Sequence, residues 1–283
     1  MPAQMPLLGG LFNKGDGGPV VIPVAGHVPI AFRVYYTPGY PPLAPDDLRV
    51  NAGEWLDRYV EEPLRSALRP VVGSEKLSYT DMAKTSFPPP LEVLQKEDVG
   101  AEERSRFEAA WQVAVVSCEA RTQVPMLGLW AAVAAGRSAA LSLKGALFDA
   151  VAVRLTSIAS YQQPIPGMGV LRAADHLAVG SSGAGGPVSW RTAGMPKFGL
   201  PDLELLEAPA GLNPRPLLEA VAQQLLDALL TANHGREEPI DQLALGPGLS
   251  LPLPGGPAEV RLLYLAGQGQ RPPVIEVLLP GAA

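Results

Sequence analysis

One short segment between two apolar runs, residues 191–204, constrains the backbone more than any other part of the chain. It reads RTAGMPKFGLPDLE and contains two glycines and two prolines. Gly194 and Gly199 can adopt positive φ angles that other residues avoid, and each proline fixes its own φ and lacks a backbone donor. We expect one defined backbone path, with Phe198 as its apolar anchor. The segment has no nucleophile–base pair, metal-ligand cluster or phosphate loop, so it predicts fold and not chemistry.

The composition is typical of a folded protein rich in turns. Hydrophobic residues make up 47% of the chain and charged residues 18%, a charged fraction below the usual value of about 25%. The 31 prolines and 30 glycines separate apolar runs and form no low-complexity tract. The net charge of −6 is spread along the chain without a basic block. We therefore expect no nucleic-acid partner.

The cysteine and hydropathy patterns predict a cytoplasmic protein that does not insert into a membrane. Cys118 is the only cysteine, which excludes an intramolecular disulfide and argues against a thiolate metal site. It ends an apolar run with no cation nearby except Arg121, so we expect an inert buried thiol. The N-terminus lacks the basic region of a secretory signal, and no apolar run reaches the length of a membrane helix.

The order of elements predicts an α+β fold, with a mixed or antiparallel sheet and helices packed mainly on one face. We expect a flexible leader over residues 1–18, an N-terminal β/α region over 19–90, and a main α+β domain with a C-terminal hairpin over 91–283. The last two regions can form one continuous domain. The predicted helices are one that begins near Asn51 and is split at Pro63, Ala101–Ala110, a largely buried one over Met126–Lys144, and one capped by Asn213 that runs to about Ala232. The predicted strands are Pro29–Tyr36, Glu75–Ala83, Trp111–Cys118, Ala146–Leu155 (or a short helix), Asp175–Val179, Val188–Thr192, a short edge strand over Leu203–Leu206, Ala258–Leu265 and Val274–Leu279.

The motifs of the central region occur in a family-like order. The strand Trp111–Cys118 precedes Gly128-Leu-Trp130, which opens the Ala-rich helix, and Gly145-Ala-Leu-Phe-Asp149 and Asp175–Val179 follow. The segment Gly194-Met-Pro-Lys-Phe198-Gly199-Leu-Pro201-Asp202-Leu-Glu204 then matches the pattern GL-x-x-FGLP-[DE]-[IL]-E well, with Met195 in place of the Leu. Over roughly residues 90–235 the chain thus resembles a bacterial family known only as domain of unknown function 4261. The resemblance implies a fold, with Gly194, Phe198, Gly199, Pro201 and Asp202 as its structural motif, and it implies no activity.

A hydrolase is one alternative, with a site around Asp175 and His176 and with Asp149 as a further carboxylate. Its nucleophile would be Ser181 or Ser182 in a glycine-rich loop. The sequence GSSG differs from the G-x-S-x-G pattern, and a hairpin loop is not the strand-to-helix turn that this motif needs. The same loop lacks a phosphate-binding pattern and opens no helix. We therefore predict no catalytic residues.

Metal and cofactor sites are not predicted either. The three histidines, His27, His176 and His234, are far apart and fit no metal-binding pattern. Asp202 and Glu204 alternate along a predicted strand, so we expect both carboxylates to face solvent. The alternative is that these two carboxylates converge in space with Asp149 and Glu207.

The aromatic residues give the only indication of a partner. We expect Trp111 and Trp130 in the core. Trp55 with Tyr59, and Trp190 with Arg191, are candidate interface residues, because aromatic residues and arginine are enriched at interfaces. The candidate interface residues are Trp55, Tyr59, Trp190 and Arg191.

These observations favour a non-enzymatic, cytoplasmic bacterial protein that binds a protein partner, as an adaptor, an immunity-like protein or a chaperone-like protein. A second hypothesis is a subunit of a homomeric assembly, in which the edge of the apolar C-terminal hairpin pairs with a neighbour. The third is the hydrolase around Asp175 and His176.

Overall fold

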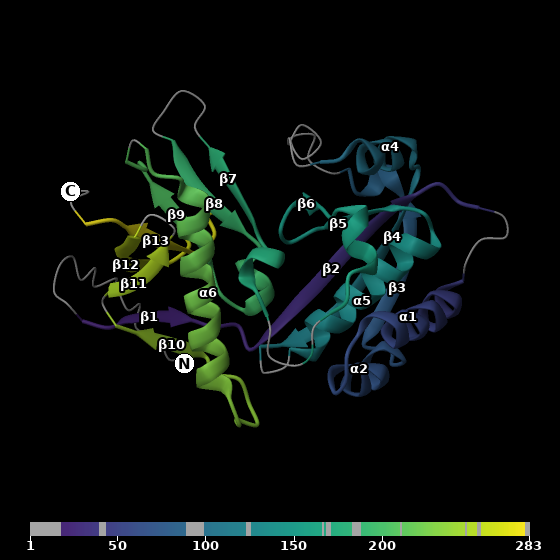
Figure 1. Ribbon diagram of the computed structural model, residues 1–283, viewed down its shortest axis with the longest axis horizontal. Coiled ribbons are helices and arrows are strands. Elements are labelled where there is room, and N and C mark those ends of the chain that lie inside the picture. The colour runs from purple at the N-terminus through teal and green to yellow at the C-terminus, as the bar shows by residue number, and fades with distance from the viewer. Residues whose placement is uncertain are drawn as a thin grey trace, which may run out of the picture.

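The chain folds into two lobes, each built on its own β-sheet (Figure 1). The computed structural model describes residues 18–39, 44–88, 99–122, 126–165, 167, 171–182, 188–209, 211–246, 248–253 and 256–280. The first lobe consists of residues 27–165, and the second combines residues 18–23 with residues 171–280. The predicted leader lies outside the described residues except for residue 18. The described polypeptide therefore starts in the second lobe, crosses into the first and returns.

The first lobe contains a five-stranded antiparallel sheet. In spatial order its strands are β3 (Leu77–Ala83), β4 (Gln112–Arg121), β2 (His27–Tyr36), β5 (Ala146–Asp149) and β6 (Arg154–Leu155). Strands β2 and β3 precede residue 90, and their neighbours β4 and β5 follow it. The expected boundary at residue 90 therefore falls within a single sheet.

Helices cover both faces of this sheet unequally. The Ala-rich helix α5 (Leu127–Ser142) lies on β2 and β4, and α1 (Pro45–Tyr59) and α2 (Leu64–Val72) pack against α5. Pro63 separates α1 from α2, as predicted. On the opposite face α4 (Ala101–Ala109) packs Phe107 against Tyr35 and Phe148. Because successive β2 side chains point to opposite faces, Phe32 and Val34 join the α5 side, and Tyr35 joins the α4 side.

The second lobe contains a six-stranded mixed sheet with one long helix on it. In spatial order the strands are β11 (Gly248–Leu253), β12 (Gly256–Leu265), β13 (Val274–Leu278), β9 (Asp202–Leu206), β8 (Ser189–Ala193) and β7 (Ala178–Ser182). Helix α6 (Pro214–Asn233) is capped by the side chain of Asn213 and packs on this sheet. A two-stranded sheet, β1 (Val20–Pro23) with β10 (Gln242–Leu245), completes the lobe. No helix within the described residues has the length and apolar character needed to cross a bilayer.

The strand predicted at an edge lies inside the six-stranded sheet. β9 pairs with β8 on one side and runs parallel to β13 on the other, and Leu203 and Leu205 are buried. The edge prediction is therefore wrong, because the parallel partner lies about seventy residues later in the chain, where no local pattern signals it. The hairpin of β12 and β13 and the α+β class are confirmed.

Two further predictions are wrong. Asp175 belongs to a 3-10 helix, η3 (Ala173–Asp175), and His176 directly follows it, so neither residue begins a strand. Trp111 is 58% exposed and lies outside the core. Its backbone N–H donates to Tyr36 O at 3.3 Å, and its carbonyl accepts from Lys84 N at 3.0 Å. The end of the sheet thus uses the backbone of Trp111, while the indole faces solvent.

Four segments from distant parts of the sequence meet where the lobes join. Ala25 N donates to Gly199 O at 2.9 Å, and Thr122 N donates to Gly26 O at 3.0 Å. The Thr122 carbonyl accepts from Asn233 Nδ2, at the end of α6, at 2.6 Å. The connection at residues 24–26 is thereby bonded to both lobes, and the bond from Asn233 to the buried Thr122 links the lobes directly.

Candidate functional site

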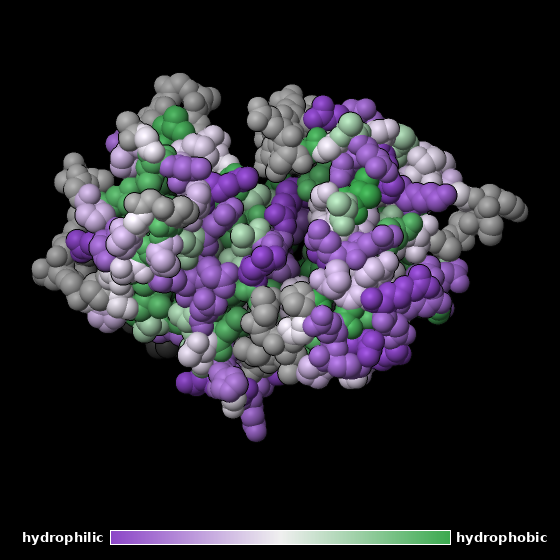
Figure 2. Space-filling model, in the orientation of Figure 1, coloured by the Kyte–Doolittle hydropathy of each residue, from purple (hydrophilic) through white to green (hydrophobic). Residues whose placement is uncertain are grey.

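A pocket of about 450 Å³ lies between the lobes. Its walls come from α5 (Trp130, Val133, Arg137), from β5 and β6, from the segment around the 3-10 helix η2 (Ile158–Gln162), and from η3 with His176. In the space-filling view the surface is hollowed between the lobes, next to hydrophilic residues (Figure 2). A volume of this size is within the range of small-molecule sites.

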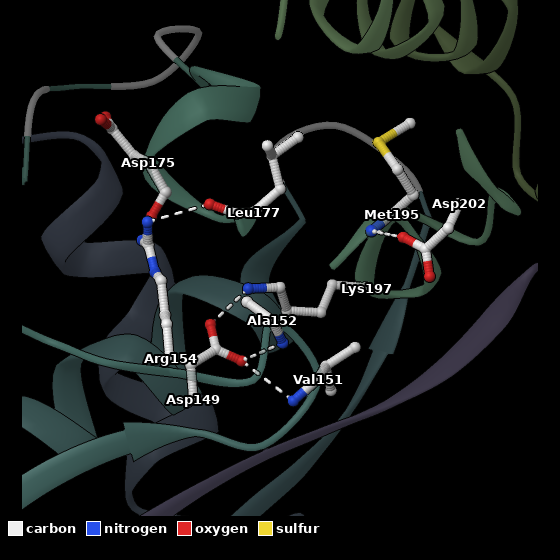
Figure 3. A network of polar contacts seen from close by, with 9 residues as sticks. All are labelled: Asp149, Val151, Ala152, Arg154, Asp175, Leu177, Met195, Lys197 and Asp202. Carbon is white, nitrogen blue, oxygen red and sulfur yellow. Dashed lines mark hydrogen bonds and ion pairs between the residues drawn. The ribbon is translucent and has the colours of Figure 1, made fainter. Parts of the chain in front are cut away.

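A buried ion pair joins the lobes behind the pocket. Lys197 of the 3-10 helix η4 (Met195–Phe198) and Asp149 at the end of β5 have almost no exposed side-chain surface, and Lys197 Nζ is 2.5 Å from Asp149 Oδ2 (Figure 3). The other oxygen, Oδ1, accepts from the backbone N–H groups of Val151 and Ala152 at 3.1 and 3.0 Å. Burial lowers the pKa of Lys197, whereas the charge of Asp149 opposes that change. The pair is thus fully hydrogen-bonded on its acidic side, as a buried carboxylate requires.

Arg154, on strand β6 of the β5–β6 hairpin, connects this hairpin to η3. Its Nη1 donates to Leu177 O at 3.0 Å, and its Nη2 donates to the backbone oxygen of Asp175 (Figure 3). The carboxylate of Asp175 is turned to Arg172, whose Nε is 3.0 Å from Oδ2. Arg154 therefore fixes the backbone that carries Asp175 and His176.

His176 is a nearly buried polar side chain in the wall of the pocket. It is 5% exposed, and its ring lies edge-on to Trp130 and Phe198, with centroid distances of 5.5 and 5.9 Å. Burial lowers its pKa well below the usual value, and the positive charges of Lys197, Arg154 and Arg137 lower it further. The imidazole is therefore neutral at pH 7, with one donor and one acceptor nitrogen.

The low pKa of His176 predicts a pH-dependent stability. Below its ordinary pKa of about 6.5 the unfolded chain binds a proton at this residue while the folded chain does not, so acidification favours unfolding. We expect the free energy of unfolding to fall by up to about 1.4 kcal/mol per pH unit between about pH 6.5 and 5.5 from this group. Urea unfolding of the wild type and of His176→Gln at both pH values tests this, with a flatter pH dependence expected for the variant. Equal slopes would contradict it.

The turn-rich segment 191–204 shapes one side of this region. Gly194 and Gly199 have φ angles of 128° and 77°, and Phe198 is fully buried beside His176. Asp202 Oδ1 accepts from Met195 N at 3.2 Å and from Thr192 Oγ1 at 3.2 Å, so it closes the turn that precedes β9 (Figure 3). Pro201 lies directly before this strand.

The expectation that Asp202 and Glu204 face solvent is wrong. Burial raises the pKa of Asp202, while its backbone and hydroxyl donors partly offset that rise. Glu204 is 9% exposed and accepts from Arg271 Nη2 at 2.6 Å. Because β9 is flanked by strands on both sides, its acidic residues need internal partners. Among the described residues, no three acidic, His or Cys side chains are grouped so that they could hold a metal ion.

The candidate interface residues do not form one surface. Trp55 is 4% exposed and donates from Nε1 to Tyr161 O at 2.9 Å, so this indole packs in the core of the first lobe. Tyr59 packs beside it on α1, with ring centroids 5.1 Å apart. Trp190 and Arg191 are half-buried on β8, in the other lobe. The helical pattern of α1 is confirmed, but the indole lies on the buried face of the helix.

The residues considered for a hydrolase are gathered in one place without being in contact. Asp149, Asp175 and His176 all line the pocket. Within the described residues, however, His176 has no hydrogen bond to either carboxylate. Ser181 is exposed on β7 and is not part of the pocket wall, and the side chain of Ser182 lies outside the described residues.

Sequence reasoning missed the cations of the site. Lys197 lies in the turn-rich segment 191–204, where a lysine is expected to face solvent. The structure instead buries it fully. Arg137 is a lone charge in the apolar run of α5, which is the one signal that the sequence offers. Cys118 is buried, and burial raises its pKa, so the thiol stays protonated at pH 7.

No protein-family model, curated protein or solved structure matches this chain. The resemblance to domain of unknown function 4261 therefore remains a prediction from the sequence.

Proposed function

We propose that this protein binds a small organic molecule in the pocket between its lobes. The observation that carries the proposal is His176, a neutral imidazole that is 5% exposed, lines the pocket and has no hydrogen-bond partner among the described residues. Its ring supplies one donor and one acceptor nitrogen at the pocket wall, so a ligand with a hydrogen-bonding group can pair with it.

The shape and composition of the pocket support the same proposal. Apolar side chains such as Trp130, Val133 and Ile165 share the pocket wall with polar and charged side chains. This combination is typical of ligand sites, in which apolar walls supply affinity and convergent polar groups fix orientation. Walls contributed by both lobes also allow a ligand to contact both at once.

A ligand screen with a blocked pocket tests the proposal. Ala174 is exposed at the pocket wall, so Ala174→Trp is expected to fill the pocket without disturbing the core. Ala159→Trp is the matched control, because Ala159 is exposed on the neighbouring η2 and does not line the pocket. Fragments detected by ligand-observed NMR should bind the wild type and Ala159→Trp, and should lose binding to Ala174→Trp. A screen without hits, or hits that Ala174→Trp binds equally well, would refute the proposal.

A protein partner is the second candidate, and the exposed indole of Trp111 favours it. If the protein is a bacterial cytoplasmic adaptor, this side chain would lie in a protein–protein interface that buries at least about 1,000 Å². Purification from the native host with light scattering should then yield a stoichiometric complex that Trp111→Ala weakens. A homomeric assembly would instead give a larger mass with no second protein, and a bare monomer would speak against both.

A further inference from the structure

Among the described residues three arginines line the pocket, but only one of them has a carboxylate partner. Arg172 pairs with Asp175 and its side chain is 70% exposed. Arg137 donates to the backbone oxygen of Gln163 at 3.2 Å, and Arg154 donates to backbone oxygens only. Within the part of the chain that the structure describes, neither of these two arginines forms an ion pair. Carbonyl oxygens orient a guanidinium group but do not neutralise it, so no carboxylate pairs directly with either positive charge.

Positive charge is concentrated around His176. The charged groups that face this ring come from α5, β6 and η4, and they are Arg137, Arg154 and Lys197. Burial lowers the pKa of Arg137, the charge of Asp175 raises it, and that of Arg154 lowers it again, so the two arginines lie close enough to repel each other. In a pocket partly shielded from water, such a field attracts a negative charge.

Two polar groups at the same place lack partners. Arg154 Nε is buried and makes no hydrogen bond within the described residues. The His176 ring, at the pocket wall, likewise has no hydrogen bond to any residue that the structure describes. Arg154 Nε is closed off from solvent, whereas the His176 nitrogens are not among the buried atoms without a partner and are therefore open to a ligand in the pocket. An oxyanion is the group that accepts from guanidinium and imidazole N–H donors together.

We infer that the pocket binds an organic oxyanion, a carboxylate or a phosphate monoester, with its charged group between Arg137 and Arg154 and its apolar body against Trp130. The neutral ring of His176 donates one hydrogen bond to the same oxyanion. This inference rests on the proposed function and specifies its ligand class. The planar indole and the neighbouring Val133 and Ile165 provide a surface for a ring or a short hydrocarbon chain.

The test compares three probes of similar shape: benzoate, phenyl phosphate and neutral benzamide. Each is titrated by ligand-observed NMR into the full chain as the wild type and as Arg137→Gln, Arg154→Gln and Arg58→Gln. Arg58→Gln is the control, because Arg58 is exposed on α1, pairs with Glu54 and does not line the pocket. Circular dichroism and the thermal midpoint show that each variant is folded. If Arg137→Gln does not fold, Arg137→Lys, which retains the charge, takes its place in the titrations.

At least one anionic probe is expected to bind about tenfold or more tightly than benzamide. Each of Arg137→Gln and Arg154→Gln should weaken that probe about tenfold or more, since a charge-assisted hydrogen bond is lost. Arg58→Gln should change the affinity less than about threefold, as expected for an exposed, paired charge outside the pocket. Preference for benzoate or for phenyl phosphate separates the two kinds of oxyanion.

Two results would overturn the inference while leaving the ligand pocket intact. One is benzamide binding as tightly as the anions, and the other is unchanged anion binding in both Arg137→Gln and Arg154→Gln. Absence of binding by all three probes would also overturn it, and the fragment screen reports separately on the pocket itself.

Discussion

Replacing Lys197 with methionine is expected to lower the free energy of unfolding by about 3–5 kcal/mol. The substitution keeps the unbranched apolar part of the side chain and removes only the ammonium group. Asp149 then remains buried, with two backbone N–H donors but no counter-charge. The loss arises from this stranded charge, because a buried ion pair contributes little net stability compared with an apolar pair but is costly to break on one side.

Urea unfolding followed by circular dichroism measures this effect. Lys76→Met is the control, because Lys76 is exposed, and its replacement should change stability by no more than about 0.5 kcal/mol. The double variant Lys197→Met with Asp149→Asn should lose less than the sum of the two single variants, since the second change removes the stranded charge. If Lys197→Met behaved like Lys76→Met, the ion pair would not be an important link between the lobes.

The elements of this fold could be predicted because their signals are local. The alternation in β2, the split of α1 from α2 at Pro63, and the N-cap of α6 at Asn213 each depend on residues within one or two turns of chain. The division into two lobes could not be predicted in this way. It depends on pairings such as β9 with β13 and β1 with β10, whose partners are far apart in the sequence.

The site was harder to predict than the fold, for a related physical reason. Its cations have ordinary local surroundings in the sequence, and their character comes only from burial and from neighbours in the other lobe. Lys197 meets Asp149 across 48 positions of chain, and Arg154 meets the backbone of Leu177 across 23. Asp175 and His176 are adjacent in the sequence and suggest an acid–base pair. In the structure, however, the Asp175 carboxylate accepts from Arg172, and the His176 imidazole lines the pocket.

Substitution of Gly199 by alanine is expected to destabilise the protein by about 2–4 kcal/mol, for two reasons that can be separated. At φ 77° an L side chain is strained, and a Cβ atom would also lie 2.3 Å from Ala25 O and 2.8 Å from Thr122 Cγ2. Both contacts belong to the junction of the lobes, where Gly199 O accepts from Ala25 N. Because the first contact is with backbone, it cannot be relieved by a rotamer change.

Gly235→Ala separates the strain from the clash. Gly235 has a similar φ of 71°, but a Cβ atom at this position would meet no other part of the described chain within 4 Å. Its replacement should therefore cost only the conformational strain of about 1–2 kcal/mol. Urea unfolding of both variants gives the difference, which measures how tightly the lobes are packed at Gly199. A larger loss for Gly199→Ala means that the junction cannot open to admit one methyl group, and hence that the pocket walls are held at a fixed spacing. Equal losses would mean that the junction yields, and the pocket would then have to be treated as adjustable in width.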